Sequence, residues 1–244
     1  MCTFAPKFNV YMNIAVILAG GVGKRLGLSM PKQFLKVSGR MVIEYSIEAF
    51  EKNPDIDEIA IVSHADYVGE FQEMVRRNAW KKVRRILLGG KERYDSSLSA
   101  IRAYEDKHDV RLIFHDGVRP LVSQRIISDV VHALDTYDAV NVAIPSSDTI
   151  LEVEDNFIKS IPDRSRLRRC QTPQGFRLET IRDAYNLAVK DPAFRATDDC
   201  GVVLKYLPHV PIYVVEGEGI NIKLTYTEDI PVVERYLKRL GIRG

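Results

Sequence analysis

The sequence predicts an α/β protein with a Rossmann-like, mainly parallel sheet and helices on both faces. Short apolar runs of about half a dozen residues alternate along the chain with amphipathic stretches of helical length. Several of these runs are apolar throughout, which is typical of strands buried on both faces. A repeating order of strand and helix favours parallel strands joined by crossover helices.

Six apolar runs are expected to form the strands. They span Asn13–Ala19, Glu58–Ser63, Val83–Leu88, Val110–Asp116, Ala139–Pro145 and Pro211–Gly217. The stretches with helical spacing span Met41–Lys52, Asp66–Ala79, Asp95–Lys107 and Ser123–Thr136. Ser123 is placed to act as an N-cap. Because ligands of such sheets lie beyond the carboxyl ends of the strands, functional residues are expected in the loops that follow them.

One stretch interrupts the alternation. Two short extended pieces, Thr149–Val153 and Phe157–Ile161, flank the polar turn Glu154–Asn156 and predict a protruding β-hairpin. A small arm buries little surface by itself, so it must pack on the body or on another chain. We predict a single domain over residues 12–244, a projecting arm over 146–175 and an N-terminal extension over 1–11.

Composition and charge exclude several classes of protein. Lys and Arg number 35 against 33 Asp and Glu, a formal net charge of +2, so bulk electrostatics give no basis for binding nucleic acid or a membrane surface. The apolar runs are far shorter than the roughly 18–20 residues that span a bilayer. Cys2, Cys170 and Cys200 show no C-x-x-C spacing, which argues against a disulfide framework or thiolate metal site and fits a reducing, cytoplasmic compartment.

A glycine-rich loop follows the first strand, at residues 20–27, and PKQF stands at residues 31–34. Such a loop lets backbone N–H groups approach phosphate oxygens, and Arg25 and Lys32 could complete the charge balance. The G-x-G-x-x-G pattern fails because Leu26 stands at its last glycine, and the Walker A pattern fails because Arg25 follows Gly23-Lys24. Alone, the loop is equally well explained as a tight structural turn with surface cations.

Polar loops also follow two further strands. GGKERYDS, at residues 89–96, places the hydroxyl of Ser96 at a helix start, and HDGVRP, at residues 115–120, carries Asp116 and Arg119. Loops after successive parallel strands converge on one edge of the sheet. Two alternatives remain open here: Asp116 and Arg119 could form a structural salt bridge, and His115 could be a satisfied strand-end histidine rather than a lining residue.

The chain as a whole resembles a known family. LAGGVGKRLG, PKQF, GGKER, HDGVRP, SDT, PDRSRLRRCQTPQGF, TDD and NIKLT stand in the order found in cytidylyltransferases that act on 2-C-methyl-D-erythritol 4-phosphate and on ribitol 5-phosphate. The resemblance covers nearly the whole chain. It implies transfer of CMP from CTP to a polyol phosphate with release of pyrophosphate, Mg²⁺ as the metal, and a homodimer held by the arm.

The same resemblance implies where CTP binds. Backbone contacts to the triphosphate would come from Ala19, Gly20, Gly21 and Gly23. Arg25 would bind the β and γ phosphates, while Lys32 and Lys223 would stabilise charge that develops at the α-phosphate. Cytosine would be read by Gly89, Gly90 and Lys91, with Ser96 nearby. Asp116 would approach the ribose and the metal.

For the acceptor, the resemblance implies a site shared between two subunits. Arg119 and Thr197 match positions near the acceptor, although Thr197 could instead cap a helix over residues 198–205. Thr149, Arg164 and Thr172 match positions that bind the acceptor phosphate, with Thr149 and Arg164 offered by the partner subunit.

Three segments give conflicting signals about the acceptor. Methylerythritol enzymes usually read HDAARP, whereas HDGVRP is closer to the HDSVRP of ribitol-phosphate enzymes, and SSDTILEV lacks flanking basic residues. PDRSRLRRCQTPQGF favours the methylerythritol branch. Methylerythritol 4-phosphate is therefore the leading acceptor and ribitol 5-phosphate the alternative. Nucleotidyl transfer to a sugar 1-phosphate is disfavoured by GGKER and QTPQGF, and a non-catalytic nucleotide-binding module is disfavoured by Arg25, Lys32, Asp116 and Lys223 together.

Overall fold

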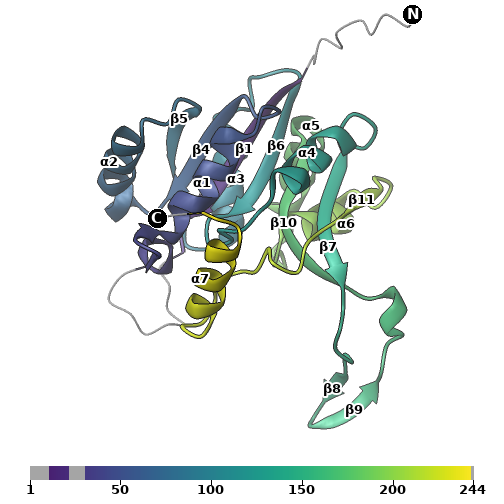
Figure 1. Ribbon diagram of the computed structural model, residues 1–244. Coiled ribbons are helices and arrows are strands. Elements are labelled where there is room, and N and C mark those ends of the chain that lie inside the picture. The colour runs from purple at the N-terminus through teal and green to yellow at the C-terminus, as the bar shows by residue number, and fades with distance from the viewer. Residues whose placement is uncertain (1–10, 22–30, 243–244) are drawn as a thin grey trace, which may run out of the picture.

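A seven-stranded sheet with helices on both faces forms the body of the chain (Figure 1). The computed structural model describes residues 11–21 and 31–242. The strand order is β11-β7-β10-β6-β1-β4-β5. These strands are β1 Met12–Ala19, β4 Glu58–Ser63, β5 Val83–Leu88, β6 Val110–Asp116, β7 Ala139–Pro145, β10 Arg168–Arg177 and β11 Ile212–Glu216. The six predicted strands are all confirmed, and the mainly parallel α/β fold with them.

Seven α-helices lie in the described part of the chain. They are α1 Val42–Lys52, α2 Val68–Asn78, α3 Arg93–Ala103, α4 Gln124–Ala133, α5 Leu178–Ala188, α6 Asp199–Tyr206 and α7 Asp229–Arg239. The hydroxyl of Ser123 accepts a hydrogen bond from the Ile126 N–H, which confirms Ser123 as the N-cap of α4. Helix α6 is capped by Asp198, whose carboxylate accepts from the Gly201 N–H, so the alternative of a Thr197 cap is wrong.

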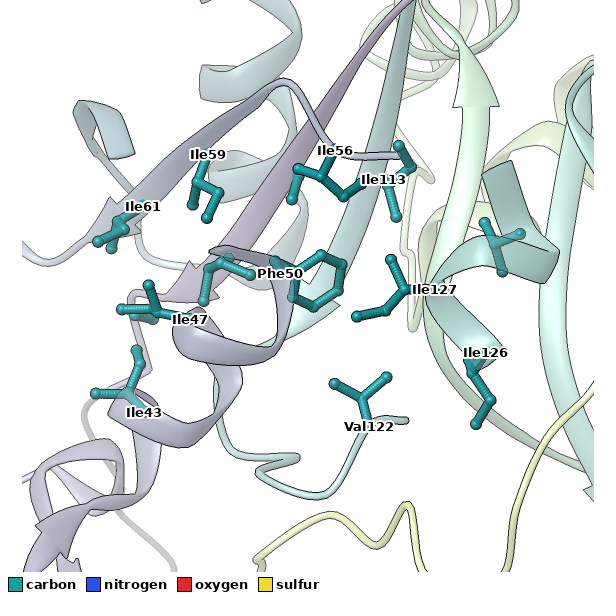
Figure 2. Packing of buried hydrophobic residues seen from close by; sticks show 14 of the residues in the cluster. Ile43, Ile47, Phe50, Ile56, Ile59, Ile61, Ile113, Val122, Ile126 and Ile127 are labelled. Atoms are coloured by element: carbon teal, nitrogen blue, oxygen red, sulfur yellow. The ribbon is translucent and has the colours of Figure 1, made fainter. Parts of the chain in front are cut away.

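Two apolar clusters hold these helices on the two faces of the sheet. On one face, Phe50 of α1 lies among Ile47, Ile113 and Ile127 (Figure 2). Phe50 is fully buried, and burial of such a side chain contributes roughly 1.5–3 kcal/mol. Helices α3, α5 and α6 cover the opposite face through a second cluster that includes Tyr185. Buried residues on both faces explain why the strands read as uninterrupted apolar runs.

A third, smaller cluster fixes the loops at one end of the sheet. Helix α7 packs there against the short hairpin of β2 Lys36–Val37 and β3 Arg40–Met41. Val118, after β6, and Leu224, after β11, are buried in this cluster. The Leu224 N–H donates to the Val118 carbonyl over 2.9 Å. Two loops far apart in sequence are thereby held side by side.

Strand β10 is the exception to the parallel order. It runs antiparallel between β6 and β7, whereas β1 pairs in parallel with both β4 and β6. From β1 the connections lead outward in both directions, so the carboxyl ends of β1 and β6 mark the topological switch point, which is where α/β sheets bind ligands.

The predicted hairpin projects from the body (Figure 1). It consists of β8 Glu152–Glu154 and β9 Phe157–Ser160, joined by Asp155 and Asn156, whose φ angles are 51° and 67°. Two consecutive positive φ angles are typical of a tight hairpin turn. Because β10 pairs with β6 and β7 in the central sheet, the projecting part ends before Arg168 and is shorter than the predicted 146–175. The predicted extension over 1–11 lies almost wholly outside the described residues.

Within the described ranges, no helix has the length and apolar character required to cross a lipid bilayer.

Gly175 in β10 provides a test of how tightly α4 packs on the sheet. A Cβ at Gly175 would lie 2.8 Å from Val130 Cγ1 and 2.9 Å from Leu134 Cδ1. Gly175→Ala should therefore lower the free energy of unfolding by about 1–3 kcal/mol, because overpacking forces α4 outward. Gly69→Ala in α2 is the control: its Cβ would meet nothing within 4 Å, and its stability should stay equal or rise. Urea unfolding of both variants measures the difference, and equal stabilities would contradict the tight packing.

Candidate active site

The centre of the candidate site is the carboxylate of Asp116, at the end of β6. Its side chain is buried and contacts three cationic groups from three segments of the chain. Lys223 Nζ lies 3.0 Å from Oδ2, Arg119 Nε lies 3.4 Å from Oδ2, and Arg93 Nε lies 4.0 Å from Oδ1. The sheet topology thus unites HDGVRP, NIKLT and GGKER at one point.

The charge state of Asp116 follows from these contacts. Burial alone would raise the pKa of its carboxyl, but Lys223, Arg93 and Arg119 together hold that pKa well below its usual range. Asp116 is therefore an anion at any physiological pH. The salt bridge between Asp116 and Arg119, which the sequence left as an alternative to a functional pair, is present inside the cluster.

His115 fixes the loop behind this carboxylate. It is fully buried, and its Nε2 lies 3.1 Å from the Arg119 carbonyl oxygen while its Nδ1 lies 3.0 Å from Thr172 Oγ1. A carbonyl can only accept, so Nε2 carries the proton and Nδ1 accepts from the Thr172 hydroxyl. Both ring nitrogens of His115 therefore have hydrogen-bond partners. Of the two alternatives given by the sequence, His115 is the buried structural histidine and not a residue that lines the site. The same Thr172 hydroxyl accepts from the Asp116 N–H over 3.1 Å.

Asn221 fixes the NIKLT segment in place, as His115 fixes the loop after β6. Asn221 was assigned no role from the sequence. It is fully buried, and its side-chain amide donates to the Thr172 carbonyl over 2.9 Å. The backbone carbonyl of Asn221 accepts a hydrogen bond from Arg119 Nη1 over 2.8 Å. Asn221, two residues before Lys223, and Leu224, directly after it in the third cluster, hold the backbone on both sides of Lys223, and its ammonium group lies at Asp116.

The predicted cytosine loop approaches the first glycine loop closely. A Cβ at Gly20 would lie 3.1 Å from Ser96 Oγ, and one at Gly89 would lie 2.7 Å from the same atom. A Cβ at Gly90 would lie 2.3 Å from the Cβ of Asp95. Gly89 and Gly90 leave no room for a Cβ because α3 begins against the loop, and the fit at Gly20 is tight. Gly20, Gly89 and Ser96 thus lie together, while Lys91 is exposed beside them.

Lys32 is positioned by its neighbour in the chain. It opens the short 3-10 turn η2, Lys32–Phe34, in which Gln33 is buried. Gln33 Nε2 donates to the Ala19 carbonyl over 2.7 Å, which ties the PKQF turn to the end of β1. Gly21 follows this point and is exposed. The predicted contacts of Gly23 and Arg25 lie outside the described residues.

Of the predicted acceptor residues, three are exposed and two are buried beside Asp116. Thr149 and Arg164 are exposed on the arm, where Arg164 Nη1 donates to the Ser147 carbonyl over 3.2 Å. Thr197 is exposed just before α6. Arg119 and Thr172 are buried in the cluster, with their polar groups engaged by neighbours.

An ion pair between Arg93 and Asp199 was also missed. Arg93 Nη1 lies 2.8 Å from Asp199 Oδ2. Burial alone would lower the pKa of Arg93, but Asp199 and Asp116 raise it above its usual range. Both residues stand inside motifs that the sequence singled out, GGKER and TDD, and that membership is the only signal that could have marked them.

The HDGVRP departure has a packing explanation. A Cβ at Gly117 would lie 2.8 Å from Ile43 Cδ1 and 3.1 Å from the Leu18 carbonyl oxygen, so this position faces α1 and β1. Val118 is buried in the third cluster. Neither position directs a side chain toward the Asp116 carboxylate. The departure is therefore explained by packing against α1, β1 and the third cluster.

Asp116 is the one predicted metal ligand. In the portions of the chain that the structure describes, no three His, Cys, Asp or Glu side chains gather into a metal-binding group. Mg²⁺ commonly takes one or two carboxylates and completes its coordination with substrate phosphates and water. An ionised Asp116 fits that kind of site, and a cage made of protein ligands alone is absent from these residues.

Comparison with known proteins gives consistent results. The family model for 2-C-methyl-D-erythritol 4-phosphate cytidylyltransferase matches residues 13–239. A protein of that name from Thermobifida fusca is 46% identical over 230 residues, covering 92% of each chain. A bifunctional ribulose 5-phosphate reductase/CDP-ribitol pyrophosphorylase from Haemophilus influenzae is 43% identical, but the match covers 93% of this chain and only 48% of that protein. The crystal structure of 4-diphosphocytidyl-2C-methyl-D-erythritol synthase from Anaerococcus prevotii superimposes with a TM-score of 0.82 at 28% identity, over 94% of this chain and all of the other.

The buried His115 predicts how stability depends on pH. Burial lowers its pKa from 6.5 to about 4, so the unfolded chain takes up a proton in the window between these values while the folded chain does not. Stability from this group is complete above pH 6.5 and is lost as the pH falls, by about 2 kcal/mol between pH 7.5 and 5. His115→Gln should lose less stability over that interval in urea unfolding, whereas His209→Gln, at an exposed position, should follow the wild type. An identical pH slope for His115→Gln and the wild type would contradict the burial argument.

Proposed function

The chain belongs to the 2-C-methyl-D-erythritol 4-phosphate cytidylyltransferase family and transfers CMP from CTP to that acceptor, and we propose that the cluster around Asp116 is where the transfer takes place. The observation that carries the assignment is the family match over residues 13–239. The structure supports this assignment because GGKER, HDGVRP and NIKLT meet at Asp116, at the switch point of the sheet.

The reaction makes defined demands on such a site. A phosphate oxygen of the acceptor attacks the α-phosphorus of CTP, a new P–O bond forms, and the bond from the α-phosphorus to the bridging oxygen breaks to release pyrophosphate. Catalysis of this kind depends on positioning and on charge stabilisation more than on covalent participation by the protein. The site must therefore present fixed cations and a tight backbone loop.

The described residues can meet these demands in distinct ways. Lys223 is held on Asp116, with its side chain 41% exposed, so its ammonium group is fixed in direction yet accessible to a ligand. A lysine is suited to this role because it is a compact point charge. Lys32, in the turn tied to β1, would supply the second charge at the α-phosphate. Gly20 and Gly89 let both loops close on Ser96, which would present their backbone groups to the nucleotide together.

Mg²⁺ is part of this proposal. When bound, it would neutralise charge on the triphosphate, and Asp116 is the described residue placed to hold it. We also propose a reducing, cytoplasmic location, because Cys170 and Cys200 are both unpaired thiols.

The assay that tests the function is pyrophosphate release from CTP and Mg²⁺, run in parallel with methylerythritol 4-phosphate and ribitol 5-phosphate. We expect the higher kcat/KM with methylerythritol 4-phosphate. Lys223→Ala should lower kcat by about 10²-fold or more, as expected for removal of a transition-state charge contact. Lys190→Ala, an exposed lysine after α5, is the matched control and should behave as the wild type. Preference for ribitol 5-phosphate, or for UTP over CTP, would overturn the assignment.

A homodimer held by the arm completes the proposal. Six large apolar side chains of the arm are exposed: Ile150, Leu151, Val153, Phe157, Ile158 and Ile161. So many exposed large apolar side chains on one projecting arm favour a protein interface there. The arm leaves the sheet at the end of β7 and returns at the start of β10, on the edge where Asp116 lies. In a twofold dimer, each arm can therefore carry Thr149 and Arg164 to the site of the partner subunit.

Phe157, 73% exposed at the start of β9, provides the test of this dimer. Phe157→Asp should convert dimer to monomer in size-exclusion chromatography with light scattering, because a charge in an apolar interface is costly. It should also raise the acceptor KM more than the CTP KM. Leu204→Asp, at a position 64% exposed on α6, is the control and should remain dimeric. A wild type that is monomeric at assay concentration would refute the proposed dimer.

A further inference from the structure

Arg93 lies between two carboxylates and is shared unequally by them. Its Nη1 lies 2.8 Å from Asp199 Oδ2, whereas its Nε lies 4.0 Å from Asp116 Oδ1. Arg93 is the first residue of α3 and Asp199 the first residue of α6. A guanidinium that directly pairs with a carboxylate stands at about 2.7–2.9 Å from it. Arg93 is therefore paired with Asp199 and only near Asp116.

Asp199 is held in place from its other side. It is fully buried, and its Oδ1 accepts a hydrogen bond from the Tyr185 hydroxyl over 2.7 Å. Its backbone N–H donates to Gln174 Oε1 over 3.2 Å. Tyr185 lies in α5 and Gln174 in β10, both fully buried. Asp199 is thus a rigid anchor for Arg93 on the side of α6.

The consequence is that the two oxygens of Asp116 differ. Oδ2 contacts Lys223 at 3.0 Å and Arg119 at 3.4 Å. Oδ1 faces Arg93 at 4.0 Å, and none of the hydrogen bonds among the described residues reaches this oxygen, whereas Oδ2 accepts one from Arg119. Arg93 Nη2 and Asp199 Oδ2 are both buried without a hydrogen-bond partner in residues 11–21 and 31–242, so Asp199 holds Arg93 as an ion pair by charge and proximity. The side of Asp116 that faces Arg93 is therefore the side with unused hydrogen-bonding capacity.

We propose that Asp199 is a positioning residue: by retaining Arg93 it keeps the Oδ1 of Asp116 available to the substrates. This inference rests on the proposed function of the Asp116 cluster and deepens it. Without the negative charge at position 199, Asp116 becomes the strongest partner of Arg93. A shift of about 1 Å would then close the gap to Oδ1 and occupy the oxygen with a direct ion pair.

In a double-mutant cycle, this proposal predicts that the second substitution partly restores the activity lost through the first. Asp199→Asn should lower kcat/KM for the acceptor by about tenfold or more, within the range of coupled neighbours. Arg93→Gln in the Asp199→Asn background should recover part of that loss, because it removes the competing cation. A pair with only a structural role would give the opposite result, since the double variant would lack both partners. A double variant no better than Asp199→Asn alone therefore overturns the proposal.

A crystal structure of Asp199→Asn provides a readout that does not depend on activity. The expected result is an Arg93 nitrogen within about 3.2 Å of Asp116 Oδ1. An unchanged separation near 4 Å would overturn the inference even if activity had fallen. If instead the wild type releases no pyrophosphate from CTP with either polyol phosphate, the proposed function fails, while this distance still decides the competition for Arg93.

Two further variants separate positioning from loss of folding. Tyr185→Phe removes the hydrogen bond to Asp199 Oδ1 and keeps both charges, so it should cause a smaller loss of acceptor kcat/KM in the same direction; an unchanged kcat/KM would count against the anchor. Asp135→Asn is the matched control, because Asp135 pairs with the buried Arg111 over 2.8 Å near the opposite end of β6. It should lower the unfolding midpoint and leave the acceptor and CTP KM values unchanged.

Discussion

The buried carboxylate of Asp116 is the group on which the arrangement of the site depends. A buried charge is tolerated only when it is compensated, and here Lys223 and Arg119 contact the carboxylate while Arg93 adds its positive charge from 4.0 Å. These residues come from the start of α3, the loop after β6 and the segment after β11. The need to satisfy one anion thus draws together three segments far apart in the sequence. Removal of that anion would leave three like charges close together.

Much of the fold could be predicted because local signals agree with the tertiary structure. Strands such as β4 and β6 are buried on both faces and read as uninterrupted apolar runs, and Ser123 is both an N-cap residue by type and the N-cap in fact. The end of the arm was misplaced for a different reason. Arg168–Arg177 belongs to the central sheet only through antiparallel pairing with β6 and β7, and periodicity along the chain does not reveal pairing with distant strands.

For the site, the sequence could identify residues by motif and not by contact. Asp116, Arg119 and Lys223 were named, and the structure brings them together. Arg93 and Asp199 stood inside quoted motifs without a role, since only the tertiary structure, which brings the first residues of α3 and α6 together, reveals that they form an ion pair. Gly117 was taken as a signal about the acceptor, yet its missing Cβ makes room for Ile43 and the Leu18 carbonyl. Chain position near a ligand site does not tell which way a side chain points.

The antiparallel insertion of β10 divides the neighbouring sequence into two parts that tolerate change differently. The hairpin of β8 and β9 is tied to the body only at its two ends, so residues could be added or removed near its tip without moving any strand of the sheet. In β10, by contrast, Gln174 lies opposite Phe114, and Thr172 reaches Asp116 and His115 only in that register. A single inserted residue between Thr172 and Gln174 would turn Thr172 away from both. Among related chains, length variation should therefore concentrate at the hairpin tip, while the spacing within β10 stays constant.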